Sequence, residues 1–161
     1  YQGVTGALPE PAVPWTGARI VPLSRVPMAE LLHYDRAFFA APREAFLREW
    51  IAQPGTVALG LVAGDALQGY GVLRPCRVGF KIGPLFADSP SGAEALFGVL
   101  SAAAPPGQPL FLDVSVAHAE AVDLARRHGM QVVFETARMY TGAAPDLSAA
   151  RSWGITSFEL G

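Results

Sequence analysis

The order of apolar and polar positions along the chain predicts helices and short strands in mixed order. Apolar runs of strand length cover residues 18–23, 56–62, 67–74 and 78–86, and β-branched or aromatic residues are frequent in them. Gly64-Asp65, between the second and third runs, is a strong signal for a tight hairpin turn. Three successive strands joined by short turns predict an antiparallel meander.

Apolar residues at helical spacing predict three helices that flank the meander. Pro27 suits the first turn of a helix, and the helical pattern then runs on through 27–38. A proline interrupts this pattern, which resumes over 43–51. After the meander, the small-residue loop 88–92 leads into a helix over 93–104. Two helices are therefore expected before the meander and one after it.

The next part of the chain predicts a strand, a helix and two further strands. Residues 110–114 form the apolar strand, and Ser115 can cap the helix that follows. That helix ends at Gly129, which can adopt the left-handed conformation found at many helix ends. A strand with charged residues follows Gly129. After a loop over 143–154, a final strand is expected over 155–160.

This order of elements predicts a single α/β domain, of the α+β kind, built on a mixed and mostly antiparallel sheet. The strands over 78–86 and 110–114 are joined by a helix, so they are expected to run parallel through a right-handed crossover. A chain of 161 residues is long enough to bury one core. Residues 1–17 carry prolines and glycines without periodicity, and we interpret them as a linker or extended arm. The domain would then cover 18–161.

The composition of the chain argues against nucleic acid, a membrane and a metal ion as binding partners. The net charge of −2 gives no basic stripe for nucleic acid, and no apolar run of about 18 residues predicts a membrane span. Cys76 is the single cysteine, which excludes an internal disulfide and a thiolate metal cluster. The histidines show no metal-ligand spacing, so no metal site is predicted. A cytoplasmic protein without nucleic-acid or membrane partners is expected.

The loop over 88–92 is the first candidate site. It follows a strand and opens a helix, so its free backbone N–H groups could hold a phosphate. Ser89 or Ser91 could instead serve as an ordinary helix N-cap, and the sequence leaves both interpretations open. Gly69-Tyr-Gly71 is not a dinucleotide-binding motif, because it lies inside a hairpin and no third glycine follows.

Charged residues near strand ends form the second group of candidates. Asp113 lies at the C-terminal end of a central strand, where a catalytic carboxylate is often found. It could equally cap the helix that follows. Glu135 and Arg138 alternate to opposite faces of a predicted strand, so they either pair with neighbours or line a site.

Five segments, taken together with the order of elements, resemble one protein family. They are YDRAFFAAPREAFLREW (34–50), GYGVLRP (69–75), FKIGPLFAD (80–88), FETARMYTG (134–142) and TSFELG (156–161). The sequence is similar to the GNAT family of acyl-CoA N-acyltransferases. It resembles most the second domain of bacterial acetyltransferases built from two tandem GNAT units. The resemblance implies a preceding GNAT domain, with residues 1–17 as the tail of its last strand and the linker.

The resemblance also implies a reaction and a cofactor. It implies an N-acetyltransferase that uses acetyl-CoA and a small-molecule or peptide amine, on a GNAT fold with one splayed parallel pair and helices on both faces. In that fold the crossover helix begins at a loop that holds the CoA pyrophosphate, and the splayed strands admit the pantetheine arm. The implied cofactor-binding residues are Leu85, Phe86, Ala87, Ser89, Ser91, Gly92 and Ala93.

Acyl transfer from a thioester also needs a base, an acid for the leaving thiolate and a surface for the acceptor. Asp113 or Glu135 would act as the base, and Tyr140 is the nearby phenol that would replace the acid which the family carries at position 125. Backbone N–H groups near Leu85 and Phe86 would polarise the thioester carbonyl. The implied acceptor-binding residues are Asp35, Arg43, Lys81 and Arg138.

Two positions depart from the family pattern. Asp88 stands where the loop usually begins with a cation, and Ala125 replaces the tyrosine that commonly protonates the thiolate. The alternative is a non-catalytic GNAT-like domain that binds a ligand or completes the acceptor site of a partner catalytic domain. The final strand over 155–160 could also pair with a second copy, which would make a homodimer.

Overall fold

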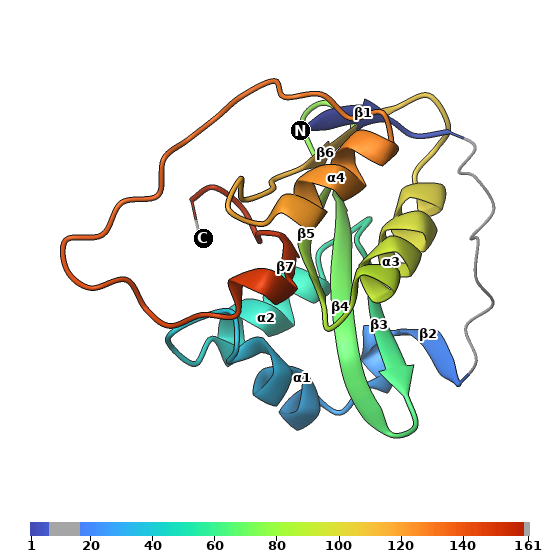
Figure 1. The fold of residues 1–161 in the computed structure, drawn as a ribbon. Helices are drawn as coiled ribbons and strands as arrows, with labels where there is room; N and C mark the ends of the chain where they lie inside the picture. The colour runs from blue at the N-terminus through green and yellow to red at the C-terminus, as the bar shows by residue number, and fades with distance from the viewer. Residues whose placement is uncertain (7–16, 160–161) are drawn as a thin grey trace.

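The computed structural model describes residues 1–6 and 17–159 and contains one mixed sheet of seven strands. The strand order is β1-β6-β5-β4-β3-β2, and β7 pairs with β5 outside this path (Figure 1). The strands are β1 (Gln2–Val4), β2 (Ala18–Pro22), β3 (Val57–Ala63), β4 (Ala66–Pro75), β5 (Phe80–Ala87), β6 (Pro109–Leu112) and β7 (Ser152–Gly154). All neighbouring strands are antiparallel except β5 and β6.

The predicted meander and parallel pair are confirmed. β2, β3, β4 and β5 pair in succession, and the β3–β4 turn contains Gly64 at a φ of 59°, where a Cβ is unfavourable. β5 and β6 run parallel from the pair Phe80↔Leu110 to the pair Ile82↔Leu112. β6 ends there, whereas β5 continues with β7 as its neighbour. The parallel strands thus separate, and we call the gap between them the splay.

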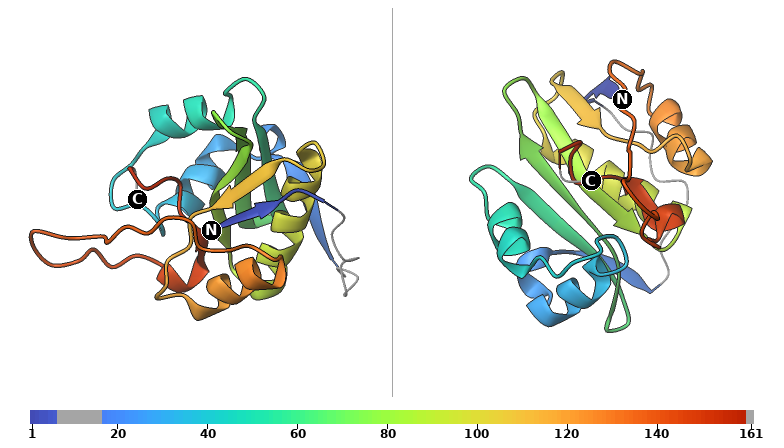
Figure 2. Two further views of the ribbon diagram at one scale, coloured as in Figure 1. Left: turned by 90° about the horizontal axis from the view of Figure 1, so that it is seen from above. Right: turned by 90° about the vertical axis from the view of Figure 1, so that its left-hand side faces the viewer.

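Helices cover both faces of the sheet (Figure 2). They are α1 (Met28–Asp35), α2 (Glu44–Ile51), α3 (Pro90–Ala103) and α4 (Ala119–Arg127), with the short 3-10 helices η1 (Leu23–Arg25) and η2 (Ala149–Arg151). α3 and α4 belong to one hydrophobic cluster, and α1 and α2 to a second one. The expected fold class is therefore confirmed. Within the described ranges, none of the helices is long and apolar enough to cross a membrane.

The α3 helix shows how local sequence and packing act together. Ser89 caps its first turn, and Pro90 occupies the position where a missing N–H costs least. Leu96, Phe97 and Leu100 recur at helical spacing and are at most 1% exposed. Burying each of these side chains stabilises the fold by about 1.5–3 kcal/mol. The helix begins earlier than predicted because the proline joins its first turn.

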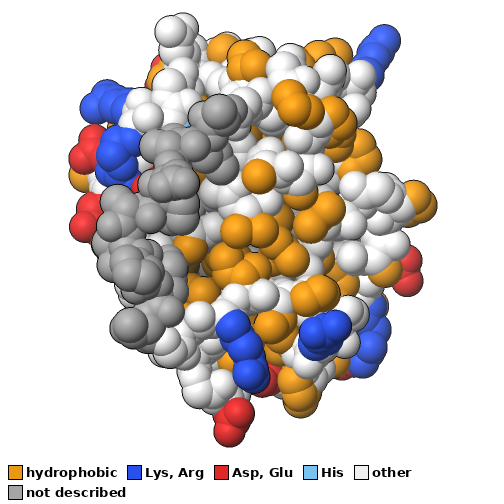
Figure 3. All heavy atoms as spheres, turned by 90° about the vertical axis from the view of Figure 1, so that its right-hand side faces the viewer, with side chains coloured by type: hydrophobic (Ala, Val, Ile, Leu, Met, Phe, Trp, Pro, Cys, Tyr) orange, Lys and Arg blue, Asp and Glu red, His pale blue; other side chains and the backbone are white. Residues whose placement is uncertain are grey.

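The sheet is less completely covered near β2 and β3. Ala18, Ile20, Val57 and Leu59 contact the cluster under α3 but are only partly buried. Hydrophobic side chains gather on the surface on the side of the molecule that carries these strands (Figure 3). The apolar core therefore reaches the surface at this edge of the sheet.

Two predicted strands are wrong. After Gly129, Gln131 alone forms a bridge, with Gln2 of β1, and residues 132–142 contain no strand. The last strand is β7, inside the predicted loop, whereas 155–159 is not a strand. A strand forms only where its backbone N–H and C=O groups can bond to the free edge of a neighbouring strand. In the splay, β5 has such a free edge, and β7 pairs with it. The short β1 offers an edge to Gln131 only.

The N-terminal segment, expected to be a linker or the tail of a strand from a preceding domain, contains one short strand. Gln2–Val4 form β1 and pair with β6. Residues 7–16 of the expected linker, like residue 160 of the expected final strand, lie outside the described residues. For residues 7–16 the linker interpretation stays a prediction.

Candidate functional site

A segment of the chain itself occupies the splay between β5 and β6. β7 pairs with β5 at Leu85 and Phe86. The Trp153 side chain is 1% exposed, and its indole N–H donates to the carbonyl oxygen of Ala87 at 3.1 Å. We call residues 152–157 the plug segment.

The plug segment is also held on the side of β6 and α4. His118 Nδ1 lies 3.0 Å from the carbonyl oxygen of Ser152, and the imidazole ring lies 4.6 Å from the ring of Trp153. The N–H of Ile155 donates to the carbonyl oxygen of Asp113 at 2.9 Å. The plug segment therefore joins β5 to the chain that follows β6.

The family resemblance placed the pantetheine arm of CoA in this splay. The space holds the indole of Trp153 and the backbone of the plug segment instead. The three residues of β5 that were predicted to bind the cofactor are at most 3% exposed. In this arrangement, the residues of the splay do not fit a pantetheine arm.

The loop before α3 has the geometry of a capped helix start. Ser89 Oγ accepts a hydrogen bond from the N–H of Gly92 at 3.1 Å. Ser91 is exposed, and its Oγ lies 3.3 Å from Ser89 Oγ. Of the two interpretations left open for this loop, the N-cap is the one that the structure shows. Phosphate binding by the loop stays a prediction.

Replacing Ser89 by alanine is expected to lower the free energy of unfolding by about 1 kcal/mol, because one backbone N–H of α3 loses its partner. Ser91→Ala is the matched control, since Ser91 caps no backbone N–H; its change should stay within about 0.5 kcal/mol. Urea denaturation of both variants measures the difference, and equal stability losses would contradict the assignment of Ser89 as the cap.

Asp88, at the start of that loop, is paired with a cation from a distant part of the chain. Arg151 Nη2 and Nε lie 2.6 and 2.8 Å from Asp88 Oδ1, and the Tyr34 hydroxyl donates to the same oxygen at 2.7 Å. The guanidinium lies over the rings of Tyr34 and Phe38, at 4.9 and 5.2 Å. Burial and the hydrogen bond to Asp88 raise the pKa of Tyr34, so its phenol remains a donor at neutral pH.

Two residues predicted to bind the acceptor form a buried ion pair with each other. Arg43 donates to both carboxylate oxygens of Asp35 at 2.7 Å, and the two side chains are 7% and 3% exposed. The Tyr70 hydroxyl donates to Asp35 at 2.6 Å, and Arg43 donates to Thr156 Oγ1 at 3.3 Å. The pair therefore joins the α1–α2 layer to β4 and to the plug segment.

The predicted base is paired with a third residue predicted to bind the acceptor. Lys81 Nζ forms an ion pair with Asp113 Oδ2, and both side chains are largely buried. Lys81 Nζ also lies 5.1 Å from the centre of the Phe158 ring. In this structure, Asp113 neutralises a neighbouring ammonium and joins β5 to the end of β6.

The other predicted site residues lie elsewhere. Glu135, Arg138 and Tyr140 belong to the exposed segment that follows Gln131, and Arg138 Nη1 lies 3.5 Å from the Tyr140 hydroxyl. Among the described residues, no hydrogen bond or ion pair joins any of them to Asp113. Their roles as base, acid and acceptor ligand stay predictions.

Sequence reasoning missed the residue that fills the splay and the residues that bind beside it. Trp153 and Arg151 lay in a predicted loop, and no role was predicted for His118. One signal was present, because Trp153 is a large aromatic residue among small and polar ones (SAARSWG). Burial of such a side chain is the expected outcome in a folded domain.

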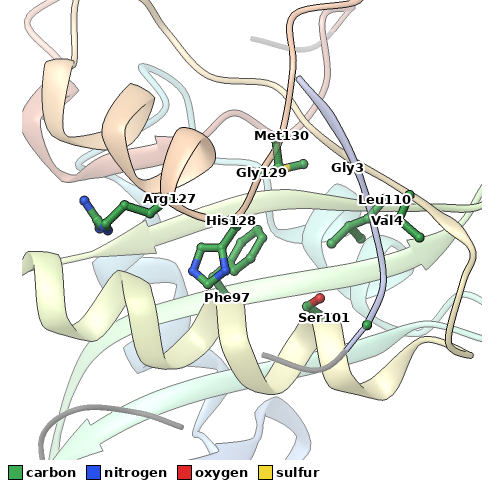
Figure 4. A pocket seen from close by; sticks show the side chains of 10 residues that line it. Gly3, Val4, Phe97, Ser101, Leu110, Arg127, His128, Gly129 and Met130 are labelled. Carbon is green, nitrogen blue, oxygen red and sulfur yellow. The ribbon is translucent and has the colours of Figure 1, made fainter. Parts of the chain in front are cut away.

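A separate pocket of about 250 Å³ lies between α3, β1 and the end of α4 (Figure 4). Phe97 and Ser101 line it from α3, and His128 and Met130 line it from the end of α4. None of its lining residues belongs to the plug segment. Among the described residues, no group of three His, Cys, Asp or Glu could hold a metal ion.

Glu94 joins α3 to the end of α4 beside this pocket. Arg127 donates to Glu94 Oε2 at 2.8 Å, and His128 Nε2 contacts Oε1. Partial burial raises the pKa of Glu94, but the hydrogen bonds and charges of Arg127 and His128 lower it by more. The net pKa lies below the ordinary value of 4.5.

A carboxyl group with a lowered folded-state pKa stabilises the fold above its unfolded pKa and loses that contribution as the pH falls through the folded value. The chain is expected to lose stability in acid as the pH falls below 4.5 and Glu94 takes up a proton. We expect Glu94→Gln to remove part of this loss. The effect should be under about 1 kcal/mol, because the carboxylate is partly exposed. Glu49→Gln is the control, since Glu49 is exposed and carries no ion pair among the described residues. Urea denaturation from pH 7 to 3 checks this, and identical acid losses in Glu94→Gln and the parent chain would contradict it.

Fold and site together define a domain of the acyltransferase class whose central gap is filled by its own chain. The family model described as "Acetyltransferase (GNAT) domain" matches residues 31–153, and the chain belongs to this family. Among characterised relatives, it is similar to a holothin acyltransferase from Pseudoalteromonas sp. (strain SANK 73390), with 26% identity over 132 residues. The match covers 82% of this chain and 45% of that relative, so the chain spans about half the length of the curated relative.

Solved structures agree on the fold. A candidate acetyltransferase from Pyrococcus horikoshii superposes with a TM-score of 0.67 at 24% identity, over 94% of this chain and 48% of that one. An aminoglycoside acetyltransferase from an uncultured soil metagenomic sample superposes with a TM-score of 0.50 at 12% identity, over 79% of this chain and 95% of that one. At these identities the similarity shows the fold alone.

Proposed function

We propose that this chain is a GNAT half of a longer acyltransferase, that it does not hold acetyl-CoA itself, and that it completes the acceptor site of a companion catalytic GNAT domain. The observation that carries the proposal is the plug segment, which occupies the space expected for pantetheine. Ala125 supports it, because this position offers no phenol for a leaving thiolate.

The lengths of the relatives support a companion domain. The holothin acyltransferase and the Pyrococcus protein are each about twice as long as the part matched by this chain. In the longer protein, an acetyl group would pass from the thioester of acetyl-CoA to the neutral amine of a small molecule or peptide. The Asp35–Arg43 and Lys81–Asp113 pairs would keep this half rigid beside that reaction.

Catalysis by this chain itself is the second candidate, and family membership favours it. It would require the plug segment to leave the splay. It would also require Lys81 to release Asp113, because a base must be free to accept the ammonium proton of the acceptor. Both changes break buried contacts, so the arrangement of the described residues favours the first candidate.

Titration with acetyl-CoA separates the two candidates. We expect no thermal shift and no calorimetric heat for this chain at about 1 mM acetyl-CoA, whereas a ligand at 100 times its Kd stabilises a protein by about 2.7 kcal/mol. An active single-domain GNAT acetyltransferase, run beside it, is the positive control. A saturable stabilisation of this chain by acetyl-CoA, absent with CoA-free acetate, would overturn the proposal and support catalysis in this half.

A further inference from the structure

The segment between Val132 and Tyr140 has the composition of a strand but pairs with no strand in the described part of the chain. Its Phe134 ring lies 5.8 Å from the ring of Phe158. Every residue of the segment is exposed, and no backbone hydrogen bond among the described residues involves it. It leaves the body of the domain as a long excursion (Figure 2, left). Its large hydrophobic side chains are Val132 (50% exposed), Val133 (56%), Phe134 (63%), Met139 (86%) and Tyr140 (47%).

This exposure is unfavourable in water, because five large apolar side chains would each gain by burial. The segment is also rich in β-branched and aromatic residues, which favour strands. An extended segment with unpaired N–H and C=O groups is a template for another strand. These properties together indicate an interface rather than a free loop.

The anchor of the segment determines where a partner strand would lie. Gln2 and Gln131 exchange both backbone hydrogen bonds, at 2.7 and 2.8 Å, in an antiparallel bridge. Continuing this register places Val132 opposite Tyr1, and Val133 and later residues opposite positions beyond Tyr1. On its other side, Tyr1 exchanges backbone bonds with Leu112 at 2.9 and 3.0 Å. A partner strand beside residues 133–140 would therefore lie in line with β1 and next to the sheet. We call this position the lane.

We propose that Val132–Tyr140 is an interdomain strand, which pairs with an extended strand of the companion GNAT domain entering this sheet in line with β1. The occupant follows from two observations. The lane is the continuation of β1, and the relatives carry a further half of comparable length. The inference rests on the proposed function in one respect only, since it requires the longer protein.

A second copy of this chain is the competing occupant. Antiparallel pairing of the segment with itself, centred between Thr136 and Ala137, would place Glu135 opposite Arg138 of the other copy and the reverse. Such charge pairs stabilise a ladder by about 0.2–1 kcal/mol each. A ribbon of two isolated strands is marginally stable at best, so the sheet of a companion domain is the better partner.

Hydrogen–deuterium exchange tests the proposal. The 161-residue chain is compared with the natural polypeptide that carries this domain and its companion. We expect amides of residues 133–139 to exchange at unprotected rates in the shorter chain and on the order of 100-fold more slowly in the longer one. Amides of α3 should be protected in both, which controls for unfolding.

Proline substitutions locate the ladder within the segment. Because Gln131 bonds to Gln2, the odd-numbered residues direct their N–H groups toward the lane. Ala137→Pro removes one of these donors, so it should abolish the protection of neighbouring amides in the longer polypeptide. Thr136→Pro, whose N–H faces away from the lane, is the matched control and should retain most of the protection.

Three results would overturn the proposal. The first is an absence of protection in both polypeptides, and the second is a natural gene product that contains this domain without a companion. The third is protection in the short chain that rises with concentration alongside a dimer mass in light scattering, which would assign the segment to a second copy. Acetyl-CoA plays no part in these measurements, so binding of acetyl-CoA would overturn the proposed function and leave this inference standing.

Discussion

Replacing Arg43 by methionine is expected to lower the free energy of unfolding by about 3–5 kcal/mol, because it leaves a buried carboxylate without its countercharge. Asp35 is 2% exposed and receives two hydrogen bonds from Arg43 and one from Tyr70. Thr156 of the plug segment also loses a donor. Urea denaturation at pH 7 measures the loss.

The matched control for this prediction is Arg48→Met. Arg48 pairs with Glu44 on the same helix at 2.6 Å, but both side chains are more than half exposed, so the loss should stay within about 0.5 kcal/mol. Arg43→Lys keeps the charge and loses the two-pronged geometry, so its loss should be smaller than that of Arg43→Met yet measurable. A loss below about 1 kcal/mol in Arg43→Met would contradict a buried, energetically important pair.

Replacing Trp153 by alanine is expected to cost about 3–5 kcal/mol of stability, because it removes a fully buried indole from between β5, α4 and His118. The carbonyl oxygen of Ala87 also loses its donor. Equilibrium unfolding in urea measures the change in stability.

Met139→Ala controls for the removal of a large apolar side chain, since Met139 is 86% exposed; its effect should stay within about 0.5 kcal/mol. Equal stability of the Trp153→Ala variant and the parent chain would show that the plug segment is not packed in the splay. In that case the space for pantetheine would be free, and the argument against acetyl-CoA binding would fail.

Local patterns predicted the elements whose partners are near in sequence. The β3–β4 hairpin followed from Gly64-Asp65, because a two-residue turn requires residues that tolerate positive φ. The parallel pairing of β5 and β6 followed from the helix between them. The predicted final strand is absent over residues 155–159, because pairing in this region is decided by the free edge of β5, which lies far away along the chain.

Charged side chains were harder to place than strands. Asp35 and Arg43, like Lys81 and Asp113, were expected to face a ligand, and the structure pairs them with one another. Ion pairing depends on distance in space and on burial, and neither quantity follows from residue type. Arg151 illustrates the same point, because it reaches Asp88 from 63 positions away.

The sequence by itself determined the order of the elements, the β3–β4 hairpin and the parallel pair of β5 and β6, since turn chemistry, helix capping and apolar periodicity act over a few residues. The splay between β5 and β6 was implied by the resemblance to the GNAT family. Only the tertiary structure decided what occupies the splay. Trp153 enters it because a large indole gains most by burial and because the edges of β5 and β6 offer hydrogen-bond partners there. That contact joins residues more than sixty positions apart, and no local pattern carries such information.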